Sequence, residues 1–417
     1  MRAKAPRVPY PAATCLTLVL LAARLFPLPP LRDALGGAAP AGVRLAFPAG
    51  YLLLQPFSAF ADFATLGSLR QDKALIAWLL LGYWIVYALR RPRPSLGSAA
   101  AGYASYLALV LATIGWAVLA ARPAARLERA SPDDLVVDFH SHTSHSKDAR
   151  RSFSPAANIE WHRRAGFDAG FVTDHNNTRG AVIAKSLSRA AWEAREPGET
   201  PYRSLEGEEL SLQNAHVVVL HAARETDNKP FDGTHEGLLR FLRECSQVSG
   251  GIAFMSLPEY WKHHPAGRWE EFVKAGARGF ELSNASPKAL EVPAADLARA
   301  AELSHAGNLP VLGVTDSHGW GAAPSNWSVM RIPGHAALGP DALELAVRGK
   351  LESAGFAAVR IVERTRRPAS PGAWVVLDPP LGAWTMLRTF SWTQIIATLA
   401  WVWGAAFLRR KLAGSRP

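Results

Sequence analysis

The chain has 417 residues, of which 49% are hydrophobic and 19% are charged, and its formal net charge is +11. This composition excludes an intrinsically disordered chain, and the length allows more than one domain. The positive charge lies at the two ends, because residues 1–129 carry a net +10 and residues 366–417 carry +6, whereas residues 130–365 carry −5. A nucleic-acid-binding protein would carry its positive charge on the folded domain, so we expect no nucleic-acid partner.

Residues 1–129 contain four apolar segments, which together predict an N-terminal membrane region. The segments at 74–89 and 95–121 contain no charged residue and approach or exceed the length that a helix needs to cross a bilayer. The segments at 12–31 and 45–63 are weaker, because each contains prolines and a charged residue, and each could cross the membrane or lie in its interface. We expect about four transmembrane helices here, with the segment at 45–63 the least supported of them.

The C-terminal segment, residues 366–417, contains one more apolar run, at about 389–408, and a basic tail follows it at 409–411. Lysine and arginine in short loops favour the cytoplasmic side of a membrane. If the tail and the arginines of residues 90–93 lie inside, the central region lies outside, and only the arginines of residues 122–129 oppose this orientation. We therefore expect an integral, multi-pass membrane protein whose central domain is extracytoplasmic.

The central region, residues 130–365, alternates β-rich runs with helical patterns. One helical pattern begins with Ser154 as its N-cap and Pro155 at the first helical position. The alternation favours a parallel sheet or an α/β barrel, in which functional side chains lie at the C-terminal ends of the strands. The predicted strands are residues 135–139, 169–173, 203–210, 216–220, 251–255, 279–282 and 309–315.

Side chains that can bind a metal follow several of these runs. His140 and His142 share one face of the chain, because side chains alternate along a strand with a period of two. A mixture of imidazole and carboxylate ligands suits Zn²⁺, Mn²⁺ or Fe²⁺ better than Ca²⁺ or Mg²⁺ alone. Clusters of these residue types occur at four of the strand ends, and together they predict a metal centre. The candidates are His140, His142, Asp148, Asp174, His175, Glu208, Glu209, His216, Asp316 and His318.

The segments DFHSHT, TDHN, GEE and GVTDSH, in this order, resemble the successive motifs of the PHP superfamily, the polymerase and histidinol phosphatase domain. The resemblance covers residues 130–365 and is closest to stand-alone members, since no polymerase or nuclease module follows. It implies a distorted seven-stranded (β/α) barrel that binds two or three divalent metal ions. It also implies hydrolysis of phosphoesters by a metal-activated hydroxide.

Carried over residue by residue, the resemblance also assigns ligands. Glu209 is preferred to Glu208 because the family pattern is Gly-x-Glu, and Asp174 is expected to orient a histidine ring. The expected catalytic residues are Glu209, His142 and Asp316. One metal would be held by His140, His142, Glu209 and Asp316, a second by Asp148, His175 and His318, and a third by Glu209 and His216.

One position departs from the family pattern. A histidine usually follows the strand at 251–255, and here Leu257 takes its place. Leucine cannot bind a metal, so the third site is expected to be weak or empty, and His263 and His264 are candidate replacements.

The sequence also suggests candidate substrate contacts and the positions of two further residues. Arg150, Arg151 and Arg179 are candidate contacts for a substrate phosphate. Glu281, at the end of a predicted strand, is expected at the rim of the site, and His162, on a helix among arginines, is expected at the surface.

The leading hypothesis is a membrane-anchored phosphoesterase that hydrolyses a phosphomonoester or phosphodiester. Its expected partners are a small phosphorylated substrate and the lipid bilayer. A second hypothesis, favoured by Leu257, is a catalytically weak domain that acts as a membrane sensor or binding module. A third is a metal-dependent hydrolase of another ester, an amide or a carbamate.

Overall fold

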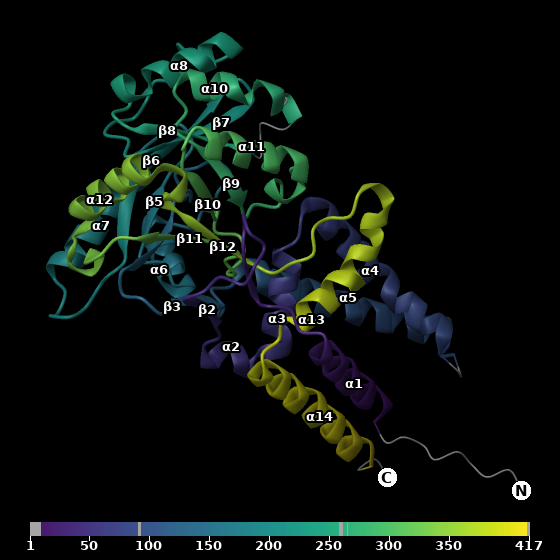
Figure 1. Cartoon of the computed structure of the whole chain (residues 1–417). Helices are drawn as coiled ribbons and strands as arrows, with labels where there is room; N and C mark the ends of the chain where they lie inside the picture. The colour runs from purple at the N-terminus through teal and green to yellow at the C-terminus, as the bar shows by residue number, and fades with distance from the viewer. Residues whose placement is uncertain (1–9, 91–92, 258–261, 265, 415–417) are drawn as a thin grey trace, which may run out of the picture.

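The computed structural model describes residues 10–90, 93–257, 262–264 and 266–414, which form a mixed α/β domain with apolar helices beside it (Figure 1). The domain is built on one ten-stranded sheet with the order β1-β12-β11-β4-β5-β6-β7-β8-β9-β10. The strands are β1 (Leu31–Asp33), β4 (Asp134–Asp138), β5 (Ala169–Val172), β6 (Arg203–Leu212), β7 (Ala215–Leu220), β8 (Ile252–Ser256), β9 (Phe280–Asn284), β10 (Val311–Val314), β11 (Asn326–Arg331) and β12 (Arg360–Arg364).

The sheet contains two parallel blocks, β4-β5-β6 and β8-β9-β10, which are separated by the antiparallel strand β7. β6 and β7 form a hairpin whose turn residues, Gln213 and Asn214, have φ angles of 49° and 56°. Two successive left-handed residues are typical of a two-residue hairpin turn. Because one reversed strand separates them, the two blocks run in the same direction and their C-terminal ends lie at the same edge.

The sheet curls until β10 approaches β11. Ser328 Oγ on β11 accepts a hydrogen bond from the Gly313 amide at 2.9 Å and donates one to the Gly313 carbonyl at 2.7 Å. This approach requires glycine, since a Cβ at position 313 would lie 2.5 Å from a methyl carbon of Ile361. The curl also pairs the backbone of Ser141 with that of Ser317, so the segments that follow β4 and β10 lie side by side.

Alternate residues of β4 face two apolar cores, as the period of two requires. Leu135 packs in the main core, whereas Val136 packs in a smaller one with Trp327. The predicted cap of α6 is present, because Ser154 Oγ accepts a hydrogen bond from the Ala157 amide. The helices of this domain are α6 (Pro155–Ala165), α7 (Arg179–Glu193), α8 (His235–Val248), α10 (Trp269–Ala275), α11 (Ala294–Ala306) and α12 (Pro340–Ala354).

Each predicted β-rich run overlaps one of the strands β4 to β10. Three strands that the sequence did not predict, β1, β11 and β12, extend the sheet with antiparallel pairs beside β4. The described residues therefore form a curled ten-stranded sheet, and a closed seven-stranded barrel is not confirmed.

Two helices, α4 (Leu69–Leu89) and α5 (Leu96–Leu119), are long and apolar enough to cross a membrane, and they extend away from the sheet (Figure 1). α1 (Pro11–Leu25) is apolar but shorter. α13 (Asp378–Arg388), together with the turn before it, meets α14 (Trp392–Gly414) at a bend of 117°, so the pair could count as one broken span. Among the described residues, two or three spans therefore satisfy length and composition, and the expected four N-terminal spans are not confirmed.

The prediction of a single span at residues 45–63 is wrong. This segment divides into β2 (Val43–Ala46), α2 (Ala49–Leu53) and α3 (Gln55–Thr65). β2 pairs with β3 (Arg126–Arg129), and Asp62 on α3 is fully buried. The physical reason is that prolines begin both short helices, and the polar residues Gln55, Ser58 and Asp62 of α3 are buried within the protein.

Candidate metal centre

The segments after β4 and β10 bring two imidazoles and a carboxylate to one edge of the sheet. The Nε2 atoms of His140 and His142, which follow β4, are 2.9 Å apart. Asp316, which follows β10, has its Oδ1 atom 3.2 Å from His142 Nε2 and 3.5 Å from His140 Nε2. Its φ angle of 48° lies in the left-handed region, a conformation that concentrates at functional sites.

Glu209 joins this pair of histidines to two further ones. Its Oε2 atom lies 3.2 Å from the Nε2 atoms of both His140 and His142 and 3.1 Å from Nδ1 of His175. Its Oε1 atom lies 2.7 Å from Nδ1 of His216. Glu209 and His216 are diagonal neighbours across the β6–β7 hairpin, a spacing that long side chains can bridge.

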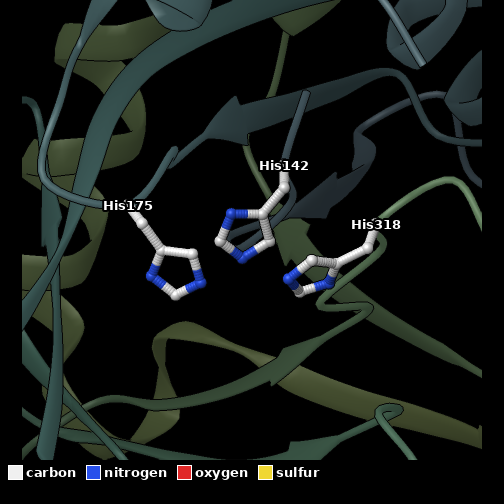
Figure 2. A group of neighbouring side chains, drawn as sticks. All are labelled: His142, His175 and His318. Carbon is white, nitrogen blue, oxygen red and sulfur yellow. The ribbon is translucent and has the colours of Figure 1, made fainter. Parts of the chain in front are cut away.

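Asp148 closes the group on the solvent side. Its Oδ2 atom lies 3.3 Å from His175 Nε2 and 3.2 Å from His318 Nε2. The rings of His142, His175 and His318 point toward a common centre (Figure 2), and those of His142 and His318 have centroids 4.0 Å apart. The Asp148 side chain is 58% exposed, whereas that of His140 is 1% exposed. A ligand can therefore reach the centre from the Asp148 side.

The donor atoms fit divalent metal ions. Ligand atoms about 2.0–2.2 Å from one ion are about 2.8–3.1 Å apart at right angles and about 3.3–3.6 Å apart at tetrahedral angles. The contacts around His142 Nε2, at 2.9–3.2 Å, lie between these limits. Two buried atoms in the group, Glu209 Oε2 and His175 Nδ1, make no well-aligned hydrogen bond within the described residues. Three overlapping groups could each hold an ion: His140, His142 and Glu209; His142, His175 and His318; and His175, Glu209 and His216.

The charges within the group are strongly coupled. Burial alone would lower the pKa of His140, but Glu281, Glu209 and Asp316 raise it well above its ordinary value. Burial would raise the pKa values of Glu209 and Asp316, yet the neighbouring imidazoles hold both well below the ordinary range. The neighbouring carboxylates likewise outweigh burial and raise the pKa of His318 to about 9. Protons on the imidazoles thus compensate the carboxylates, a role that a divalent cation could take with release of those protons.

Sequence reasoning missed the role of Glu281. Its side chain is buried and not at a rim, and its Oε1 atom lies 2.6 Å from His140 Nδ1. Ser256 Oγ and Asn284 Nδ2 donate hydrogen bonds to its Oε2 atom at 2.7 and 3.2 Å. A carboxylate on the far nitrogen of a histidine fixes the ring and leaves Nε2 for a metal. The sequence feature that could have revealed this role is the place of Glu281 on a predicted strand next to one that carries ligand candidates.

Asp174 reaches a histidine indirectly. It accepts hydrogen bonds from Thr143 N and Oγ1, both at 2.7 Å, and from Ser146 Oγ at 2.9 Å. Ser146 Oγ in turn lies 3.0 Å from His142 Nδ1. A Cβ at Gly180 would lie 1.9 Å from the Asp174 carboxylate, so this arrangement depends on a glycine at that position.

The expectation that His162 lies at the surface is wrong. Its side chain is fully buried, and its Nε2 atom lies 2.8 Å from Asp138 Oδ2 at the end of β4. Asp138 also accepts hydrogen bonds from the backbone and side chain of Thr315. α6 turns His162 inward together with Asn158, four residues earlier. The resulting network ties the end of β4 to the residue before Asp316.

The remaining predicted site residues lie outside the group. Leu257 is buried in the main core. His264 Nε2 lies 2.9 Å from the carbonyl oxygen of Gln213, and His263 is exposed, so neither belongs to the three ligand groups. Glu208 faces away from Glu209 and accepts a hydrogen bond from the amide of Thr226.

Of the candidate phosphate-binding arginines, Arg150 lies beside the ligand group, since its amide donates to the carbonyl oxygen of His318 at 2.9 Å. Its guanidinium, however, donates to the carbonyl oxygen of Leu119 at the end of α5. Arg151 is exposed, and Arg179 is exposed at the start of α7. Their contact with a substrate stays a prediction.

No protein-family model and no curated protein matches this chain. Among solved structures, a putative metal-dependent phosphoesterase from Bifidobacterium adolescentis is similar over 44% of this chain and 87% of its own, with 14% identity and a TM-score of 0.34. An amidohydrolase from Chromobacterium violaceum is similar over 45% of this chain and 88% of its own, with 16% identity and a TM-score of 0.31.

PsfC from Pseudomonas syringae is similar over 62% of this chain and 99% of its own, with 15% identity and a TM-score of 0.33. At these TM-scores the similarities carry no argument about activity, which rests on the site itself.

Proposed function

We propose that the protein is a membrane-anchored, metal-dependent phosphoesterase with the architecture of the PHP superfamily. The observation that supports this most directly is the convergence of eight ligand-capable side chains from separate strand ends. These are His140, His142, Asp148, His175, Glu209, His216, Asp316 and His318.

Divalent ions in this group would supply Lewis-acid activation of water and charge stabilisation of a phosphoryl oxygen. The buried carboxylate of Glu209 and the partly buried carboxylate of Asp316 hold the imidazoles of His140 and His142 in place and carry negative charge toward the centre. Glu281 fixes the orientation of His140. In the overall reaction, a bond forms between water oxygen and phosphorus, the bond from phosphorus to the leaving oxygen breaks, and that oxygen takes up a proton.

The proposal extends to the membrane. α4 and α5 would span the bilayer and place the metal centre on its extracytoplasmic side, with a small phosphorylated molecule as substrate. Support comes from the length and composition of these two helices and from the arginines of the loop between them.

The full chain in detergent should contain at least two divalent transition-metal ions and should hydrolyse p-nitrophenyl phosphate or its diester. His142→Ala and Glu209→Ala should each lower kcat/KM by about a thousandfold or more, because each removes a donor shared between ligand groups. Asp133→Ala, at a partly exposed carboxylate outside the ligand groups, is the control. Stoichiometric metal without hydrolysis of any phosphoester would favour the binding-module hypothesis, and absence of metal would overturn both.

A further inference from the structure

A cavity of about 800 Å³ adjoins the metal centre on the side of α4. This volume is in the range of sites for small organic ligands. Asn284 and Glu281 line it, and both contact metal-ligand candidates: Asn284 Nδ2 lies 3.3 Å from Asp316 Oδ2, and Glu281 contacts His140. Leu257 lines it as well. The residue that departs from the family pattern therefore gives this cavity an apolar wall.

The far rim of the cavity is the start of a candidate membrane span. Arg70, in the first turn of α4, lines the cavity, and its amide donates to Glu291 Oε1 at 2.8 Å. Gly372, on another side, begins the turn that leads into α13 and α14. This turn packs on α4, since Trp78 Nε1 donates to the carbonyl oxygen of Val376. The cavity thus lies between the ligand-bearing strand ends and the helices proposed to enter the bilayer.

The lining combines four arginines and three glutamates, Glu281, Glu291 and Glu363, with aliphatic side chains. Three of its arginines lie near carboxylates: Arg32 with Glu363 at 2.7 Å, Arg70 with Glu291 at 3.7 Å, and Arg367 with Asp378 at 3.0 Å. The aliphatic part of the lining includes Leu257, Leu282, Leu290 and Leu297.

Arg366 differs from the other three arginines. Within the described residues its guanidinium has no carboxylate in ion-pair distance, and it donates to the neutral hydroxyl of Ser325 at 3.2 Å. Burial lowers the pKa of Arg366, although the more distant charge of Glu363 opposes this. A partly buried guanidinium without an anion is costly, and an anionic ligand in the cavity would compensate it.

We infer that this cavity binds the phosphate-bearing head group of a membrane lipid, and that such lipids are the substrate class of the metal centre. The inference rests on the proposed function for the hydrolytic step. Arg366 binds an anionic oxygen of the head group, the aliphatic wall contacts the adjoining carbon chain, and the rest of the chain leaves past the rim that Arg70 and Gly372 form. Hydrolysis breaks the bond from phosphorus to the lipid oxygen, adds water oxygen to phosphorus, and returns a proton to the lipid alcohol.

Binding is tested first, without turnover, on the metal-free full chain in a non-ionic detergent. The probes are lysophosphatidic acid, glycerol 3-phosphate and monoacylglycerol, which separate the phosphate from the acyl chain. We expect lysophosphatidic acid to bind at least tenfold more tightly than either of the others. Arg366→Gln should weaken it by about tenfold to a hundredfold, the strength of a charge-assisted hydrogen bond. Leu257→Trp, which reduces the cavity, should weaken it as well.

Arg331→Gln, at an exposed arginine outside the cavity, is the matched control and should change nothing. Equal binding of glycerol 3-phosphate and lysophosphatidic acid would assign the cavity to soluble phosphates and overturn the lipid inference. Equal behaviour of the Arg366→Gln and Arg331→Gln variants would overturn the role of Arg366.

Turnover is measured second, on the metal-loaded chain. Lysophosphatidic acid should be converted to monoacylglycerol and phosphate, and Arg366→Gln should raise KM for it more than it lowers kcat. Hydrolysis of p-nitrophenyl phosphate without hydrolysis of the lipid would overturn the substrate class and leave the phosphoesterase proposal standing. Lipid binding that depends on Arg366, without hydrolysis of any phosphoester, would instead overturn the phosphoesterase proposal and with it the substrate class.

Discussion

At the scale of single residues, the histidine ligands depend on partners that hold their rings. Glu281 holds His140 through Nδ1, and two hydrogen bonds from Ser256 and Asn284 hold Glu281 itself. Glu281→Gln keeps the shape of the side chain but removes its charge and one acceptor. We expect metal affinity to fall by about tenfold to a hundredfold, as for other partners of ligating histidines. Competition with a chromophoric chelator measures this.

A surface pair supplies the control for this substitution. Glu271 Oε2 lies 2.7 Å from Nε2 of His235, away from the metal-ligand groups. Glu271→Gln should leave metal affinity unchanged. If Glu281→Gln binds metal like the unsubstituted chain while its melting temperature in the metal-free form falls, then Glu281 serves only packing.

At the scale of elements, the sequence predicted where strands lie, but it did not predict which strands pair at the edge of the sheet or which buried side chains contact one another. The period of two put His140 and His142 on one face, and β-rich runs marked β4 to β10, because apolar strand patterns are local in sequence. β11 was not among the predicted strands, and β12 owes its place to pairing with β11 and β1, which are distant in sequence. Glu281 and His162 were misplaced for the same reason. A helix or strand pattern indicates a buried face but not which polar residue on it finds a buried partner.

Lys185 connects three elements around the sheet. Its Nζ atom lies 2.7 Å from Glu344 on α12, 2.9 Å from Glu206 on β6 and 3.2 Å from Asp341. Lys185→Met keeps the length of the side chain but leaves Glu206 and Glu344 without their cation. Breaking a buried ion pair in this way costs about 3 kcal/mol or more. We expect the apparent melting temperature of the metal-free chain in detergent to fall by roughly 6–10 °C.

Arg189, on the same helix as Lys185, forms an exposed ion pair that provides a comparison for this loss of stability. Arg189 pairs with Asp341, and both side chains are about half exposed. Exposed pairs contribute about 1 kcal/mol or less, so Arg189→Met should change the melting temperature by less than about 3 °C. Equal effects of the two substitutions would contradict the role assigned to Lys185.

At the scale of the whole molecule, one buried carboxylate joins the helices to the sheet. Asp62 on α3 contacts Arg122, just beyond α5, at 2.7 Å and Arg364, at the end of β12, at 2.8 Å. Tyr51 donates a third contact to it at 3.0 Å. Because Asp62 and Arg122 have no exposed side-chain surface, this cluster fixes where the chain leaves the apolar helices and enters the domain.

Asp62→Ala should loosen this junction, since it leaves two buried guanidinium groups without their anion. Trypsin cleaves after arginine unless a proline follows, and Arg364, which is followed by Thr365, is protected by burial. We expect cleavage after Arg364 to become at least about tenfold faster in the Asp62→Ala variant. Asp133→Ala removes a partly exposed partner of Arg331 and should leave the rate unchanged. An unchanged rate in both variants would show that the junction does not depend on Asp62.

The arrangement of the helices also bears on the orientation of the protein in a membrane. α4 leaves the domain at Leu69 and α5 returns to it at Leu119, so the loop between them lies at the far end of this helix pair (Figure 1). α14 also runs away from the domain, and Arg410 near its end contacts the Tyr10 hydroxyl at the start of α1. Among the described residues, Arg90 and Arg93 next to the loop, and Arg409, Arg410 and Lys411 near the end of α14, therefore lie at the ends of these helices that point away from the metal centre. If these helices span the bilayer, the positive-inside rule places the metal centre outside.

Reporter fusions test both the spanning and the orientation. A fusion after Ser131 should be active only as an extracytoplasmic reporter, whereas fusions after Arg93 and after Arg416 should be active only as cytoplasmic reporters. Three fusion positions are needed because each alternative topology gives a different combination of reporter activities. If the Ser131 fusion is active only in the cytoplasm and the other two fusions only outside it, the spans are retained and the metal centre is cytoplasmic. The same side for Arg93 and Ser131 would mean that α5 does not cross the bilayer, since it is the only candidate span between those two positions in the described residues.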